Sequence, residues 1–173
     1  MGTYSSVAFM LPSSTDTGRA SFTITGTLNA KPPDWPNFAI GLVYVDGPTD
    51  SVKVIMDSDE YTISRGGPGV AVLTGACPNP PFSMSMAGYI VFSKEGYYTF
   101  HGVSGYIMNS IFYVDDKAEK SITVKLAGGQ PTGWADQVIN WLKQNWVPVA
   151  ITAGTVGTLA VVGAVAIREI KKK

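Results

Sequence analysis

Apolar and polar residues alternate along most of the first 126 positions, in short runs in which every second residue is apolar. Many of the apolar residues are β-branched or aromatic, which favours strands over helices. Turn residues separate the runs at intervals of about 8–12 residues, as in antiparallel sandwiches. The pattern predicts ten strands: Tyr4–Met10, Ala20–Leu28, Phe38–Val45, Ser51–Met56, Tyr61–Ser64, Val70–Thr74, Phe82–Phe92, Tyr97–Val103, Ile107–Val114 and Ser121–Leu126.

The connections between these runs favour an all-β antiparallel sandwich over residues 1–126. Lys31 to Pro36 and Cys77 to Pro81 are Pro-rich segments that no helix could cross. The charged segment Asp115 to Lys120 is expected to be a turn between the last two strands. Residues 127–133, rich in Gly and Pro, are expected to form a linker after the sandwich.

The pattern changes completely near the end of the chain, where the 21 residues from Val147 to Ile167 carry no charge. As an α-helix at 1.5 Å per residue they would span roughly 31 Å, which matches a bilayer core of about 30 Å. We therefore expect a transmembrane helix over residues 147–167. The alternative is a helix buried in a protein core, although such helices seldom have so long an apolar run.

Small residues recur along the expected transmembrane helix at spacings of three and four. Such a stripe lets helices approach closely in lipid, so it is a candidate surface for self-association or for packing on another membrane protein. The alternative is an apolar helix with small residues on every face. The stripe consists of Ala150, Ala153, Gly157, Ala160 and Ala164.

A second, amphipathic helix is expected over residues 134–146. Trp134, Val138, Trp141 and Leu142 fall on one face of it. Trp is common at the membrane interface, so Trp134, Trp141 and Trp146 predict a helix lying in that interface. The alternative is a helix docked on the sandwich, with its Trp side chains in an ordinary core.

Charge is distributed unevenly, although the formal net charge is zero and only 15% of residues are charged. Residues 1–126 contain eight basic and eleven acidic residues, a net charge of −3. Residues 168–173 form a basic tail of about +3, with Arg168, Lys171, Lys172 and Lys173. So few charges exclude a disordered polyelectrolyte, and the zero balance argues against a basic nucleic-acid-binding domain.

Candidate chemistry is sparse. His101 has no nucleophile motif near it, and Cys77 has no activating partner in sequence. The Gly-rich segment Arg65 to Gly69 lacks the ending of a phosphate-binding loop. Two acidic clusters do not match a calcium loop and are expected to be solvated turns. We predict no enzyme, no catalytic residue, no metal, no cofactor and no small-molecule substrate. The clusters are Asp57, Asp59 and Glu60, and Asp115, Asp116 and Glu119.

Residues Gly88 to Leu126 resemble the end of an immunoglobulin-like sandwich. Gly96 to Phe100 would be the penultimate strand and Ser121 to Val124 the last. The same residues also resemble the later strands of a jelly roll in viral capsid and trimeric ligand families. The Cys and Trp core signature of antibody domains is absent from the sequence.

Two features of the sequence disagree on the direction in which the expected transmembrane helix would be inserted. The basic tail predicts a cytoplasmic C-terminus, yet no signal peptide is expected, because the apolar run Val7 to Leu11 is too short. A lost leader, or a tail anchor inserted against the charge rule, would each resolve this. So would a virus with an internal membrane, in which the tail faces the packaged genome and can contact nucleic acid non-specifically.

This architecture resembles capsid or penton-type proteins of the double-jelly-roll virus lineage, including archaeal members. The resemblance implies a structural protein that ties a shell to the viral membrane, as a homo-oligomer or with other capsid or envelope proteins. The alternative function is a cell-surface envelope or adhesion protein with an immunoglobulin-like ectodomain. A membrane-tethered hydrolase is the third hypothesis.

Overall fold

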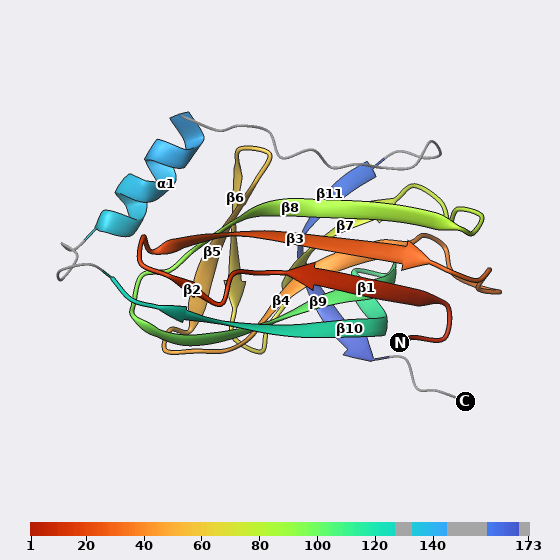
Figure 1. Ribbon diagram of the computed structural model, residues 1–173. Helices are drawn as coiled ribbons and strands as arrows, with labels where there is room; N and C mark the ends of the chain where they lie inside the picture. Colours follow the sequence, from red (N-terminus) through yellow and green to blue (C-terminus); the bar gives the residue numbers. More distant parts are fainter. Residues whose placement is uncertain (127–132, 145–158, 170–173) are drawn as a thin grey trace.

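The computed structural model describes residues 1–126, 133–144 and 159–169, the last of these by their backbone. Two β-sheets pack face to face, and one short helix lies against the first of them (Figure 1). The first sheet contains β1 (Ser5–Met10), β3 (Arg19–Leu28), β5 (Ser51–Met56), β6 (Asp59–Ser64) and β8 (Phe82–Val91). The second contains β2 (Ser14–Thr15), β4 (Ala39–Asp46), β7 (Gly69–Thr74), β9 (Gly96–Met108), β10 (Ile111–Val124) and β11 (Leu159–Glu169).

The first sheet has the order β1-β3-β8-β5-β6, and the second has the order β11-β7-β4-β9-β10-β2. Pairing within residues 1–126 is antiparallel, except for the short parallel contact of β2 with β10. The expected all-β sandwich is therefore confirmed for residues 1–126. The first seven predicted strands correspond to β1 and to β3 through β8. Tyr97–Val103 lies in β9 and Ser121–Leu126 overlaps the end of β10. The predicted strand Ile107–Val114 is wrong, because it contains the end of β9, the Asn109-Ser110 turn and the start of β10. The two-residue β2 was not predicted.

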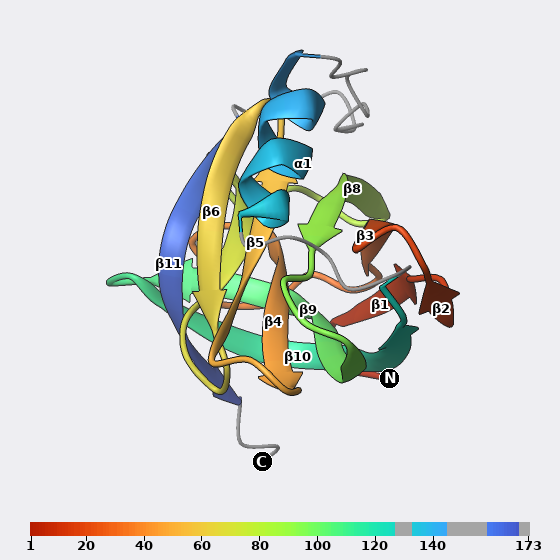
Figure 2. The same cartoon turned by 90° about the vertical axis from the view of Figure 1, so that its left-hand side faces the viewer.

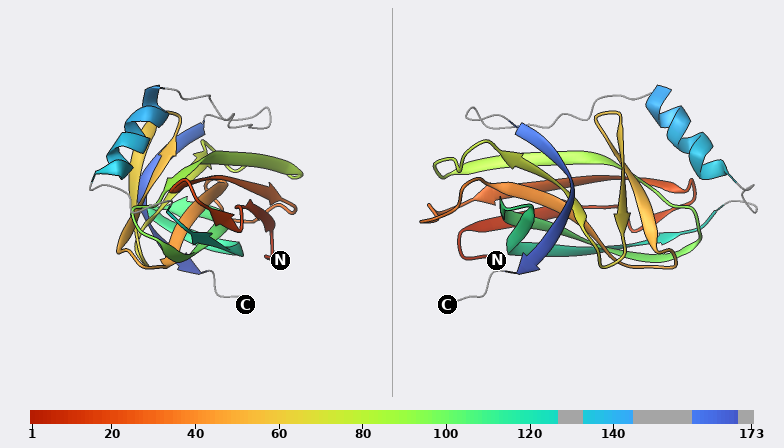
Figure 3. Two further views of the ribbon diagram at one scale, coloured as in Figure 1. Left: turned by 60° about the vertical axis from the view of Figure 1, so that its left-hand side comes forward. Right: turned by 180° about the vertical axis from the view of Figure 1, so that it is seen from behind.

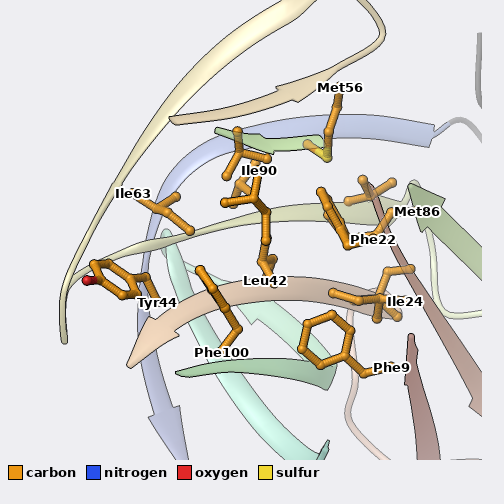
Figure 4. Packing of buried hydrophobic residues seen from close by; sticks show 14 of the residues in the cluster. Phe9, Phe22, Ile24, Leu42, Tyr44, Met56, Ile63, Met86, Ile90 and Phe100 are labelled. Carbon is orange, nitrogen blue, oxygen red and sulfur yellow. The ribbon is translucent and has the colours of Figure 1, made fainter. Parts of the chain in front are cut away.

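The main core lies between the two sheets and follows the alternation in the sequence. Phe22 and Ile24 enter it from β3, while Leu42 and Tyr44 enter from β4 (Figure 4). Phe100 of β9 lies among them and is fully buried. Each such side chain contributes about 1.5–3 kcal/mol by leaving water, so this layer is the main source of stability.

Two of the hairpins turn on residues with positive φ. Asn109 and Ser110 have φ of 52° and 60°, and they join β9 directly to β10. Asp57 and Ser58, with φ of 47° and 71°, join β5 to β6 in the same way. Positive φ at both central residues characterises the type I′ turn, whose twist suits a two-residue hairpin.

This geometry corrects the expected turn at Asp115 to Lys120. These residues lie inside β10, and the ladder with β9 continues past them after a bulge between Val114 and Asp116. Ala118 is the one apolar residue in this segment, and the six side chains of the segment are exposed or half-buried, so a mostly charged sequence can pair with β9 here without burying a charge. The charge of the segment was therefore misleading, and the true turn is the Asn109-Ser110 pair.

The expected transmembrane helix is wrong over residues 159–167, which belong to β11. This strand pairs antiparallel with β7, with Leu159 opposite Thr74, and parallel with β10, with Ile111 opposite Ala166. Residues 147–158 lie outside the described residues. Among the residues with described structure, no helix combines the length and the apolar character needed to cross a bilayer.

The sequence could support either structure. An apolar run without alternation fits a strand flanked on both sides as well as a buried helix, because periodicity does not separate the two. Val161, Val162, Val165 and Ile167 are β-branched, which favours the strand. The length of the segment and its lack of charge were therefore not sufficient to predict a helix over residues 159–167.

Candidate functional site

The most distinctive surface is the face of the second sheet that points away from the first, which we call the outer face. Part of it carries a second apolar core built from β4, β7, β9 and β10. Phe112 is completely buried there, and an added Cβ on Gly41 would come within 3.3 Å of its ring. The missing side chain of Gly41 thus leaves room for the Phe112 ring beside β4. The core residues are Ala39, Ala71, Val103, Ile107, Phe112 and Val114.

Strand β11 crosses the back of the molecule (Figure 3, right), and it pairs with β7 and β10, two of the strands that carry the second core. Because it joins β7 on one side and β10 on the other, the second sheet closes on itself. The pairing with β7 is interrupted between Val162 and Val165, where the register shifts. We call the position between the edges of β7 and β10 the β11 groove.

The rest of the outer face is open. Val43, His101 and Glu119 stand opposite one another on β4, β9 and β10, so they share this face. The His101 Nε2 lies 2.9 Å from the Glu119 carboxylate. A hollow of about 450 Å³ beside them is lined by Val43, Val45 and His101 together with Gly66, Gly67 and Pro68.

This hollow brings together His101 and the Gly-rich segment, which the sequence left unconnected. The amides of Gly66 and Gly67 already donate to the carbonyls of Tyr44 and Ser64, so they serve the turn. No nucleophile stands with the imidazole among the lining residues. The arrangement therefore supplies a shallow, mostly apolar contact surface with one polar pair.

Helix α1 (Trp134–Gln144) confirms the expected helix and packs on the outer side of the first sheet (Figure 2). Ile139 and Leu142 are buried against Ile55 and Val91 of β5 and β8. The helix thus adopts the docked arrangement that the sequence left as the alternative. Its buried face is centred on Ile139 and Leu142.

Ion pairs fasten the helix at its sides. The Lys53 ammonium lies 3.0 Å from Asp136 of α1 and 3.2 Å from Glu60 of β6. Lys143 of the helix reaches Glu60 at 3.4 Å. The hydrogen bond to Asp136 is the main reason that the pKa of Lys53 is raised, against the opposing effect of burial.

The three expected interface tryptophans differ in position. Trp134 is buried, and its ring lies against Gly18, where φ is +67° and a Cβ would collide with it. Trp141 is half exposed and carries the Arg19 guanidinium 4.4 Å above its ring. Trp146 lies outside the described residues. A membrane role for these residues remains a prediction.

The expected helical stripe and basic tail are only partly described. Ala160 and Ala164 lie in β11, so they do not share a helix face, and this part of the stripe is corrected. Ala150, Ala153 and Gly157 lie outside the described residues. Arg168 is opposite Tyr113 in the parallel pairing with β10. Lys171, Lys172 and Lys173 also fall beyond the described part of the chain.

The second acidic cluster has a structural use that the sequence did not reveal. The Asp115 carboxylate accepts hydrogen bonds from the amides of Thr3, Tyr4 and Ser5, at 3.0, 2.9 and 2.7 Å. Its neighbour Asp116 accepts one from the Val7 amide at 3.0 Å. The bulge in β10 allows both carboxylates to hold the start of β1, a contact between residues more than 100 positions apart.

The remaining candidates do not assemble into a reactive site. Burial raises the pKa of the Cys77 thiol, with the Lys31 ammonium acting in the opposite direction. Within residues 1–126 and 133–144, no three His, Cys, Asp or Glu side chains are grouped closely enough to hold a metal ion. Asp57 lies in the β5–β6 turn, while Asp59 and Glu60 lie in β6.

Comparisons with known proteins assign no family to this chain. No family model matches the chain. No curated protein matches it either. Among solved structures, the chain is similar to a conjugative transposon lipoprotein from Bacteroides eggerthii DSM 20697, with 11% identity and a TM-score of 0.41. The match covers 69% of this chain and 97% of that one. A similarity of this size assigns no function to the chain.

Proposed function

We propose that this chain is a non-enzymatic structural protein, a sandwich subunit of a protein shell that lies against a membrane, most specifically in a virion. The observation that carries the proposal is the uncharged 21-residue segment followed by a basic tail, behind a body of opposite charge. A segment of this kind must be covered by lipid or by protein, because exposing it to water is costly. We propose that it ties the sandwich to the layer beneath it.

The sandwich is proposed to be immunoglobulin-like rather than a jelly roll. The orders β1-β3-β8-β5 and β4-β9-β10 correspond to the ABED and CFG sheets of that fold. Tyr98, near the start of β9, donates its hydroxyl hydrogen bond to the Lys94 carbonyl at 2.8 Å, as the tyrosine corner does. The segment β5-β6-β7 departs from the pattern, since β7 takes the place beside β4.

Anchoring in a bilayer places a condition on β11. The 12 residues 147–158 would span about 18 Å as a helix, which is less than the bilayer core of about 30 Å. A chain that crosses the membrane with residues 147–167 must therefore withdraw β11 from its groove. Membrane insertion and strand pairing are alternatives for the same residues.

A flotation experiment with phospholipid vesicles tests the anchoring. We expect the full chain to float with the vesicles and to resist extraction at alkaline pH. The matched control carries Thr152→Lys and Gly157→Lys, which leave β11 unchanged but add about 2.5–3.5 kcal/mol per charge at the bilayer centre. This variant should stay unbound. Equal flotation of both proteins, or flotation of neither, would contradict membrane anchoring.

The basic tail is proposed to contact nucleic acid in the virion. Each phosphate contact should contribute about −0.9 to the slope of log binding constant against log salt. Replacing Lys171, Lys172 and Lys173 with Ala should therefore flatten the salt dependence of binding to duplex DNA. An unchanged slope would remove the tail from this role.

The alternative, a cell-surface envelope or adhesion protein, is favoured by the same strand order, because many cell-surface domains share it. Electron microscopy of native particles or cell envelopes separates the two. The virion proposal expects the chain in a closed icosahedral shell. Its presence in a cell envelope without such shells would support the alternative.

A further inference from the structure

The β11 groove belongs to the sandwich, whereas the strand that fills it comes from far away in the sequence. Without β11, the strands β7, β4, β9, β10 and β2 form an open arc with a free edge on β7. The start of β10, Ile111 to Val114, is a second free edge. The described side chains of the second core come from β4, β7, β9 and β10 of this arc.

No short turn ties β11 to either neighbour. The hairpins β5–β6 and β9–β10 are each closed by a two-residue turn, which forces pairing within one chain. By contrast, β11 follows α1, which is docked on the other sheet of the sandwich. Whether β11 enters the groove of its own chain or that of another copy therefore depends on the length of the connection before it and on the protein concentration.

The connection is long enough to reach a neighbouring molecule. Fourteen residues, 145–158, separate α1 from β11. Fully extended, they bridge up to about 50 Å. A chain of this length folds to a radius of gyration of about 16 Å, so the groove of an adjacent copy lies within that reach.

We propose that, in the assembled form, the β11 groove takes the β11 strand of a second copy of this chain. The backbone pairing and the covered core are the same whether the strand comes from the same chain or from another copy. Exchange therefore loses mainly the high effective concentration that an intramolecular connection provides. High local concentration in a shell offsets that cost. Each copy gives a strand on one side and receives one on the other, which links copies head to tail into rings or chains.

Cross-linking between two differently tagged full-length chains, co-expressed without added lipid, tests the proposal. Both chains carry Cys77→Ser. One carries Leu73→Cys and the other carries Ala160→Cys, positions that face each other across β7 and β11. A short bis-maleimide should join the two tagged chains into one product. The pair Ile111→Cys and Ala166→Cys examines the other edge and guards against a folding defect at Leu73.

Two controls make the result decisive. Leu73→Cys paired with Met10→Cys, an exposed position on β1 of the first sheet, gives the background from random collision. A single chain with both Leu73→Cys and Ala160→Cys shows whether β11 occupies its own groove. Mixed-chain product well above background supports exchange between copies. Product confined to the single chain, or no product in either arrangement, overturns it. Because lipid is absent, the outcome is separate from that of the flotation experiment.

Discussion

At the scale of single residues, polar side chains fix the ends of strands that the apolar pattern leaves unspecified. Asp115 is the clearest case, because one carboxylate serves three consecutive backbone amides of the N-terminal segment. Carboxylates that accept several backbone hydrogen bonds contribute more than exposed ion pairs do. Such a residue stabilises the contact between β1 and the second sheet.

We predict that Asp115→Asn lowers the free energy of unfolding by about 2–4 kcal/mol, since the amide group adds a donor where three donors already converge. Urea denaturation measures the change. Asp50→Asn is the matched control, because the Asp50 side chain is 98% exposed and its pair with Arg65 is a surface contact. A loss at Asp115 no larger than at Asp50 would contradict the anchoring role.

Two adjacent tyrosines offer a second comparison at this scale. Tyr98 is fully buried and hydrogen-bonded to the Lys94 carbonyl, whereas Tyr97 is 64% exposed. Tyr98→Phe should cost about 1–1.5 kcal/mol, the value of a typical hydrogen bond, and Tyr97→Phe should change stability by less than about 0.5 kcal/mol. Similar unfolding midpoints for the two variants would argue against the tyrosine corner.

At the scale of elements, alternation located β1 and β3 through β8, but it divided the two long strands β9 and β10 into three segments and placed the turn between them wrongly. The Asn109-Ser110 turn is a two-residue signal inside an otherwise apolar stretch, and the charged residues after it drew attention away. The two-residue β2 is too short for any periodicity. Strand β11 was predicted as helix because its apolar run is continuous. Its β-branched residues favour a strand, and its pairing with β7 and β10 is what the sequence pattern could not supply.

For the candidate site too, the sequence revealed the separate residues but not the contacts between them. Sequence reasoning found His101, the acidic clusters and the apolar C-terminal segment as separate features. It could not bring His101 next to Glu119, or Asp115 next to Ser5, because those contacts follow from the register of β10. The bulge after Val114 sets that register, and nothing in the local sequence marks it.

Helix α1 provides a prediction at this scale. Ile139→Ala should weaken its docking by about 2–4 kcal/mol, because the side chain is buried against β5 and β8. Hydrogen exchange of the helix amides should then accelerate, while exchange in β4 and β9 stays slow. The neighbouring exposed Asn140 is the control, and Asn140→Ala should leave the exchange pattern unchanged. Equal rates in both variants would show that the helix is not held by this face.

At the scale of the whole molecule, the account depends on the C-terminal segment completing the second sheet. A double-mutant cycle measures this coupling. Phe112→Ala should cost about 3–5 kcal/mol in the full chain. In a chain that ends at Gln144 the same substitution should cost much less, because the missing β11 leaves the second core exposed. Equal costs in the two backgrounds would mean that β11 does not cover Phe112.

Solution NMR of the lipid-free protein tests the central claim most directly, since it reports the conformation of residues 159–169 without any substitution. The account predicts extended-strand chemical shifts for these residues, with cross-strand contacts from Val161 to Val72 and from Ala166 to Ile111. Continuous helical shifts through residues 147–167, without contacts to residues 69–74 or 111–114, would contradict it.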